Sequence, residues 1–277
     1  MSTDTTRRRL LAAVGAGGLT ALAGCSSMTP FVGRRTARSE TISPDGAQRV
    51  AVHGSVGEIS VVGADRDDLA VDVEKQSSSI RTDLEELVFR TERDDDRLEL
   101  RSEWEGRDGW FQNQPTMNLD IDLPAELALE RIDASVGRVA VREVVGDLTV
   151  EASTGEVDIA GVDGAVGART STGRVDISNV EALEDVHTTT GEVDLEVPAI
   201  DGDTAITTTT GTIEAAIDPD IDAELHAQTN TGTVDSSGLE LAESTRSDDM
   251  LVGTLGDGGP TLRFEANTGE ISLTSLS

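Results

Sequence analysis

An eight-residue phrase recurs in this chain at an almost fixed spacing. It reads ASTGEVDI at residues 152–159, TSTGRVDI at 170–177 and TTTGEVDL at 188–195. From Gly137 to Gly232, successive copies lie 18, 18, 18, 20 and 21 residues apart, a period typical of stacked-repeat architectures. The glycines that centre the copies are Gly57, Gly137, Gly155, Gly173, Gly191, Gly211, Gly232 and Gly269.

Apolar and polar residues alternate on both sides of each central glycine. In every copy the residue five before it is apolar, the residue four before it is polar, and the residue two after it is Val or Ile. This period of two predicts β-strands, and the phase slip at the glycine predicts a corner with positive φ. A repeat of this length has no room for two strands and a crossover helix. The sequence therefore predicts an all-β fold, a β-solenoid-like stack of 18–21-residue strand–turn–strand repeats.

The repeats are expected to belong to a single domain, residues 41–277. Residues 76–124 break the period and are interpreted as an irregular insertion or a cap, with candidate strands RLELRS and MNLDIDL. Three aromatic residues, Trp104, Trp110 and Phe111, lie between these strands, either as a ligand patch or as part of a capping cluster. The 37-residue step from Gly232 to Gly269 is interpreted as an irregular last coil before the strand GEISLTSL.

The N-terminus reads as an export and anchoring signal. TRRRLL, with Arg7 and Arg8, resembles the twin-arginine export motif, and LAGC resembles a lipobox. The resemblance implies that residues 1–24 are a signal peptide cut before Cys25 and that Cys25, the only cysteine, carries a membrane lipid. The expected location is extracytoplasmic, on the outer face of the cell membrane. An uncleaved anchor or unprocessed apolar tail is the alternative.

Residues 25–40 are predicted to be a tether, because they lack a hydrophobic period. Arg34, Arg35 and Arg38 form the basic cluster of this segment. They suit either contact with anionic lipid headgroups or a solvated linker.

The formal net charge of −31 argues against a nucleic-acid partner, which needs a basic patch. A surplus of Asp and Glu with Lys75 as the only lysine is similar to proteins of salt-loving archaea. Asp158, Asp176 and Asp194, each three residues after a glycine, are predicted to form an outward acidic column. This column would be relieved by salt screening or by weak cation binding. The neighbouring column of Glu156, Arg174 and Glu192 alternates in sign and would relieve it only in part.

No catalytic motif stands out. His53, His187 and His226 are expected to be structural surface residues, because stacking in chain order separates them. Phosphate loops, dinucleotide fingerprints and paired cysteines for zinc are missing from the sequence, so no cofactor and no metal site are expected.

The order of motifs resembles a family of adhesin-type domains of unknown function. An early G-x-[IV]-x-V strand (VGEISV), a strand ending in proline (LDIDLP) and the repeats from Gly137 follow one another over residues 41–277. The resemblance implies an all-β fold without an established activity. We expect a non-enzymatic, lipid-anchored cell-surface binding or structural module with an acidic repeat face, whose partner is an envelope protein or glycan. The alternatives are a carbohydrate-active enzyme, lyase- or hydrolase-like, on a β-helix scaffold, or a role in envelope-stress sensing.

Overall fold

The computed structural model describes residues 33–106 and 114–276. Within them the strands form one large mixed β-sheet, and the one helical element is a short 3-10 helix at Leu84–Glu86, between the third and fourth strands. The all-β prediction is therefore confirmed. The strands are β1 Arg34–Ile42, β2 Arg49–Ala64, β3 Leu69–Ser77, β4 Leu87–Asp94, β5 Arg97–Trp104, β6 Thr116–Pro124, β7 Ala128–Val145, β8 Leu148–Val197, β9 Thr204–Ile217, β10 Ala223–Thr231, β11 Val234–Ser237, β12 Ala242–Arg246, β13 Met250–Leu255, β14 Thr261–Thr268 and β15 Ile271–Ser275.

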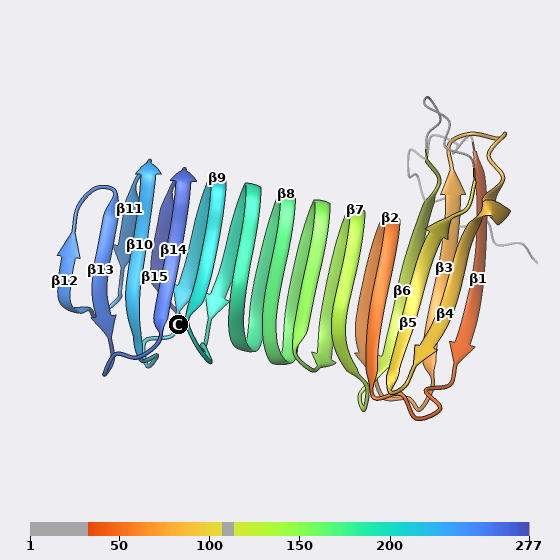
Figure 1. The fold of residues 1–277 in the computed structure, drawn as a ribbon, viewed down its shortest axis with the longest axis horizontal. Coiled ribbons are helices and arrows are strands. Elements are labelled where there is room, and N and C mark those ends of the chain that lie inside the picture. Colours follow the sequence, from red (N-terminus) through yellow and green to blue (C-terminus); the bar gives the residue numbers. More distant parts are fainter. Residues whose placement is uncertain (1–32, 107–113, 277) are drawn as a thin grey trace, which may run out of the picture. The chain divides into compact units, whose positions relative to one another are not determined.

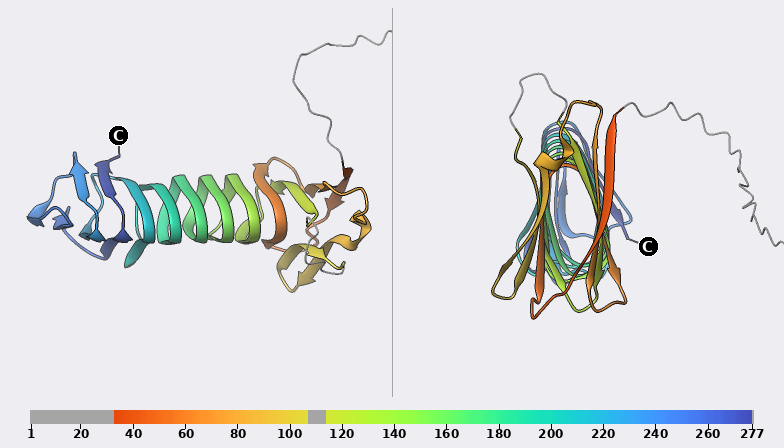
Figure 2. Two further views of the ribbon diagram at one scale, coloured as in Figure 1. Left: turned by 90° about the horizontal axis from the view of Figure 1, so that it is seen from above. Right: turned by 90° about the vertical axis from the view of Figure 1, so that its right-hand side faces the viewer.

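The repeats pair in parallel with their glycines aligned. Gly57 on β2 pairs with Gly137 on β7, which pairs with Gly155 on β8. At the other end of β8, Gly191 pairs with Gly211 on β9. Figure 1 shows these strands side by side as successive coils, and Figure 2 shows two walls of strands when the row is viewed end on. The sequence period is therefore also the period of strand pairing.

Close contact between coils explains why each copy is centred on glycine. Gly173 has φ +151°, and a Cβ built on it would lie 1.6 Å from the carbonyl oxygen of Gly155. L-residues with a side chain rarely adopt this backbone conformation, and no side-chain rotation could relieve an overlap with backbone. The predicted corner with positive φ is confirmed at this position.

The apolar columns of the repeat form the core between the two walls. The residues five before each glycine pair in register, as Ile132 does with Val150 and Val186 with Ile206, and all four are fully buried. Burying a side chain of this size stabilises the fold by about 1.5–3 kcal/mol. Pairing successive copies side by side thus buries a surface that one copy alone would expose.

The C-terminal coils do not follow chain order, which corrects the sequence interpretation. Strand β14 lies between β9 and β10, with Ile206 paired to Phe264 and Phe264 paired to Ala227. Strand β15 likewise lies between β9 and β11. The last copy in the sequence is therefore inserted before the Gly232 copy, and β13 and β12 continue the sheet beyond β10 (Figure 1).

The prediction of a tether over residues 25–40 was wrong for residues 34–40. These residues form most of β1, which pairs antiparallel with β3 along its whole length. Nearly every β1 side chain is exposed, so backbone hydrogen bonds rather than an apolar face hold the strand. The basic cluster also has partners within the chain: Arg35 pairs with Glu74, Arg38 with Glu40, and Arg34 donates to the carbonyl of Thr82.

Both candidate strands in residues 76–124 are confirmed, as β5 and β6. Each pairs in parallel with β2, and the structure adds β4 alongside β5. Trp104 packs against the hydrophobic core, which fits the capping interpretation of the aromatic residues rather than the ligand patch. Trp110 and Phe111 lie outside the described residues.

Candidate functional site

The residues four before each glycine form an outward column that borders a hollow of about 660 Å³. Parallel pairing sets His53 beside Asp133 and Asp133 beside Glu151. Serines two residues before the glycines, among them Ser135, Ser153 and Ser171, line the same hollow. The alternating pattern of the repeat thus places charged groups and hydroxyls along one surface.

A second hollow of about 340 Å³ follows on the next coils. The same column lines it with His187, Thr207, Glu265 and Gln228, and these residues again pair in register. His187 Nδ1 lies 2.7 Å from Thr207 Oγ1. We call the two hollows together the repeat groove, because the same columns of the repeat line both.

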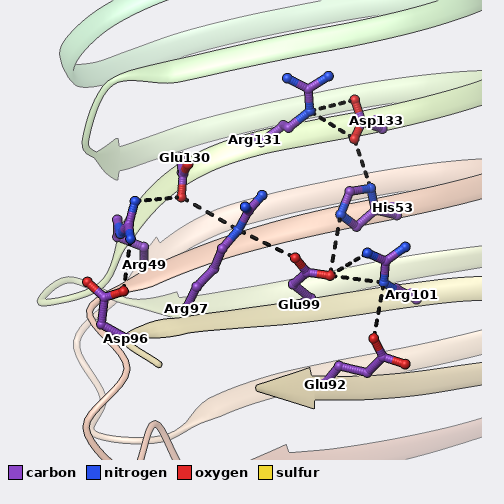
Figure 3. A network of polar contacts seen from close by, with 10 residues as sticks. All are labelled: Arg49, His53, Glu92, Asp96, Arg97, Glu99, Arg101, Glu130, Arg131 and Asp133. Carbon is purple, nitrogen blue, oxygen red and sulfur yellow. Dashed lines mark hydrogen bonds and ion pairs between the residues drawn. The ribbon is translucent and has the colours of Figure 1, made fainter. Parts of the chain in front are cut away.

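A network of ion pairs crosses β4, β5, β2 and β7 at one end of the repeat groove (Figure 3). His53 Nδ1 lies 2.8 Å from Asp133 Oδ2, and His53 Nε2 lies 4.0 Å from Glu99 Oε2. A hydrogen bond from Arg101 holds the pKa of Glu99 below its usual value despite burial. Arg131 connects the network to the groove by pairing with both Asp133 and Glu151.

A second branch of the network joins the starts of the same strands (Figure 3). Arg49 lies 2.8 Å from Asp96 and 3.4 Å from Glu130, and Arg97 lies 3.6 Å from Glu130. Because these contacts link parallel β2 and β7 to the antiparallel pair β4–β5, they favour one register where the sheet changes direction.

The His53–Asp133 pair was not anticipated from the sequence, and its geometry differs from that of a Ser–His–Asp triad. In a triad the second imidazole nitrogen contacts a serine hydroxyl. Here Nε2 is buried without a hydrogen-bond partner and faces Glu99 (Figure 3). The hydroxyls of Ser55 and Ser102, which line the same hollow as His53, bond to each other at 3.2 Å. In the part of the chain that the structure describes, the pair therefore joins β2 to β7 and His53 Nε2 makes no hydrogen bond to a hydroxyl.

The three histidines do not converge, as expected. His53 and His187 border different parts of the repeat groove, and His226 lies on β10 beside Val252 and Arg263. Within residues 33–106 and 114–276, no cluster of three metal-ligating side chains suits a metal ion, and no helix is long and apolar enough to cross a membrane. Arg7, Arg8 and Cys25 lie outside the described residues, so the export and lipid sites stay predictions.

The acidic column on the other side of the glycines is stacked but not uniform. Asp158 accepts hydrogen bonds from Arg138 and Arg142, and the Arg142 bond is the main reason that its pKa is lowered. Asp194 lies 3.2 Å from Arg174. Asp176 lies 3.6 Å from Arg174, and its pKa is raised by burial and then by Asp194 and Asp158. The raised pKa of Asp176 thus reflects burial first and repulsion by its two neighbouring aspartates second.

The two aspartates should respond oppositely to substitution. Asp158→Asn is expected to lower the free energy of unfolding by about 1–2 kcal/mol at pH 7, because two charge-assisted bonds are lost. Asp176→Asn, which removes a repelled carboxylate, is expected to raise it slightly. Folding lowers the pKa of Asp158, so its contribution to stability is fully present above the unfolded pKa of about 3.9 and is lost as the pH falls through the lower folded pKa. Folding raises the pKa of Asp176, so its destabilising effect develops as the pH rises above about 3.9.

Urea unfolding curves at pH 3 and pH 7, in low and molar KCl, measure both effects. Molar salt should narrow the difference between the two variants, since it screens pairing and repulsion alike. Equal shifts for both substitutions would show that the arginines do not distinguish the two positions.

The fold and the groove define a class of all-β repeat proteins with a polar lateral surface. Residues 118–274, more than half of the chain, match the family described as Toastrack DUF4097, and the chain belongs to this family. A search of curated proteins found no match.

Solved structures show similarity only at low identity. A protein titled "putative cell adhesion protein" from Clostridium sporogenes is 13% identical, with 88% of this chain and 100% of that chain covered at a TM-score of 0.38. A "putative adhesin" from Parabacteroides merdae is 11% identical, with 88% and 97% covered at 0.35. A "putative lipid binding protein" from Parabacteroides distasonis is 14% identical, with the same coverage, at 0.30.

Proposed function

We propose that this protein is a non-enzymatic adhesin-like module, anchored by a lipid on Cys25 to the outer face of the membrane, whose coils form a β-solenoid-like stack. The observation that carries the proposal is the alignment of the glycine-centred copies. Aligned copies turn each outward sequence position into a column, and columns of polar side chains suit the recognition of an extended partner on another surface.

The edge strands of the sheet carry features that hinder further pairing, which supports a role in binding rather than self-assembly. At one end of the strand order lies β1, which carries three arginines on an exposed edge. At the other lies β12, whose pairing with β13 shifts register between Ala242 and Thr245, with Glu243 at φ +48°. Charged residues and bulges on edge strands hinder pairing with further chains. In this proposal β1, β4 and the β12–β13 hairpin cap the stack.

The environment of the acidic groups also favours the non-enzymatic proposal. Asp133 and Glu151, two of the carboxylates that line the larger hollow, are both held by Arg131. A lyase or hydrolase would need a carboxylate or base free to exchange a proton with its substrate. If purified protein released unsaturated or reducing ends from polysaccharides, the enzymatic alternative would replace this proposal.

Adhesion itself can be measured with intact cells. Beads coated with full-length protein, linked through the N-terminus, should be retained on a layer of cells in molar KCl. Beads coated with a protein of matched size and charge should wash away. Equal retention of both kinds of bead would contradict an adhesin-like role.

Lipid anchoring is tested separately by Cys25→Ser. This variant should still be exported through the signal containing Arg7 and Arg8, but it should pass from the membrane fraction to the medium, because a lipid chain supplies about 0.8 kcal/mol per buried CH₂. Mass spectrometry should show the loss of the lipid mass. Unchanged membrane retention with no lipid mass on the parent protein would contradict the lipoprotein proposal.

A further inference from the structure

We propose that the repeat groove binds one linear, hydroxyl-rich polysaccharide, with a carboxylate-bearing sugar seated at Arg169. This inference rests on the adhesin-like function and names the class of its ligand. The ligand would run along the row of coils rather than along the strands.

Arg169 differs from the other arginines of this acidic chain. All but three of the arginines that the structure describes lie within 4.0 Å of a carboxylate. Of the exceptions, Arg34 donates to a backbone carbonyl, and Arg81 does not line the repeat groove. Arg169 lines the larger hollow, and no described carboxylate pairs with its guanidinium, although Arg101 and Arg131 in the same hollow are both paired.

The charges lining the larger hollow cancel in a chain of formal net charge −31. Arg101, Arg131 and Arg169 balance Glu103, Asp133 and Glu151. An anionic ligand group in the larger hollow is therefore repelled less than it would be elsewhere on this acidic chain. A guanidinium binds a carboxylate through two parallel hydrogen bonds, so Arg169 supplies the missing positive partner for one acidic sugar.

The remaining lining suits sugar hydroxyls. Ser135, Ser153 and Ser171 line the larger hollow, and Asn230 and Asn267 line the smaller one. Hydroxyl and amide side chains both donate and accept hydrogen bonds, as sugar hydroxyls do. Among the described residues, no Phe or Trp lines either hollow, which disfavours flat apolar ligands and bases that bind by stacking on these rings.

The direction of the groove supports a linear ligand. Outward positions repeat at each coil, and parallel strands lie about 4.8 Å apart. One pyranose unit extends a polysaccharide by a similar length. Successive sugars can therefore meet equivalent side chains on successive coils.

The test measures binding of full-length protein to two immobilised probes in molar KCl, which screens general repulsion. Alginate, a linear polymer of uronic acids, should be bound, and dextran, which lacks carboxylates, should be bound more weakly. Arg169→Gln should weaken alginate binding about tenfold, the usual effect of losing one charge-assisted contact, without changing the melting temperature. Arg81→Gln is the matched control, since Arg81 is also exposed and unpaired, and it should leave alginate binding unchanged.

Equal binding of dextran and alginate, or equal effects of the two substitutions, would overturn the inference. The cell-retention assay separates this failure from failure of the proposed function. If the coated beads are retained on cells but the protein does not bind alginate as expected, only the proposed ligand class is contradicted. Loss of both would contradict the adhesin-like function as well.

Discussion

Gly173→Val is expected to lower the free energy of unfolding by more than about 3 kcal/mol. A Cβ at this position would lie 1.6 Å from the carbonyl oxygen of Gly155, and φ is +151°. Moving Gly173 away from Gly155 would crowd Gly191, whose backbone lies so close that a Cβ built on it would be 1.7 Å from the carbonyl oxygen of Gly173. Chemical unfolding in molar KCl measures the effect.

Gly202→Val provides the matched control. A Cβ at Gly202 meets nothing within 4 Å, so this substitution should change stability by less than about 0.5 kcal/mol. Arg169→Gln, on the outward column of the same coil as Gly173, should be equally mild. If the three substitutions had similar effects, Gly173 would not stand at a close contact between coils.

Phe264→Ala is expected to cost about 3–5 kcal/mol, as truncations of fully buried phenylalanine usually do. Phe264 is 0% exposed and lies between Ile206 of β9 and Ala227 of β10. The small Ala227 leaves room for the ring, and no neighbouring strand can move into the cavity without breaking its own parallel pairing. Unfolding curves and hydrogen exchange of β10 report the loss.

The control for Phe264 is Val136→Ala, an apolar truncation at a side chain that is 45% exposed. It should cost less than about 0.5 kcal/mol. If β14 were an outer strand, as chain order suggests, Phe264 would be partly exposed. A cost for Phe264→Ala below about 1 kcal/mol would therefore contradict its insertion between β9 and β10.

The repeat itself was predictable because one constraint acts on every copy. Each glycine meets the backbone of the previous coil, and each Val or Ile two residues later faces the core, so the positions repeat in the sequence. The inward and outward assignment of residues such as Val150 and Glu151 follows from the same alternation, and the structure confirms it.

Other features depended on information that a repeat pattern does not contain. The Gly232 and Gly269 copies have equivalent columns, so either could follow β9, and only the tertiary pairing decides between them. Strand β1 lacks an apolar face, and its hydrogen bonds to β3 leave no periodic signal. The contact of His53 with Asp133 joins residues 80 positions apart, and the unpaired state of Arg169 depends on where every carboxylate lies.

Distances between spin labels along one outward column test the central claim, the in-register stack with its inserted last copy. In a Cys25→Ser background, one label replaces Ser135 and a second replaces Thr209, Asn267 or Asn230 in turn. At about 4.8 Å per coil, four, five and six steps predict separations near 19, 24 and 29 Å, before allowance for label length. A separation that grows in this order, with residue 267 closer than residue 230, is the result that the stack predicts. A shorter distance to residue 230 than to residue 267, or three distances that do not increase by similar steps, would contradict it.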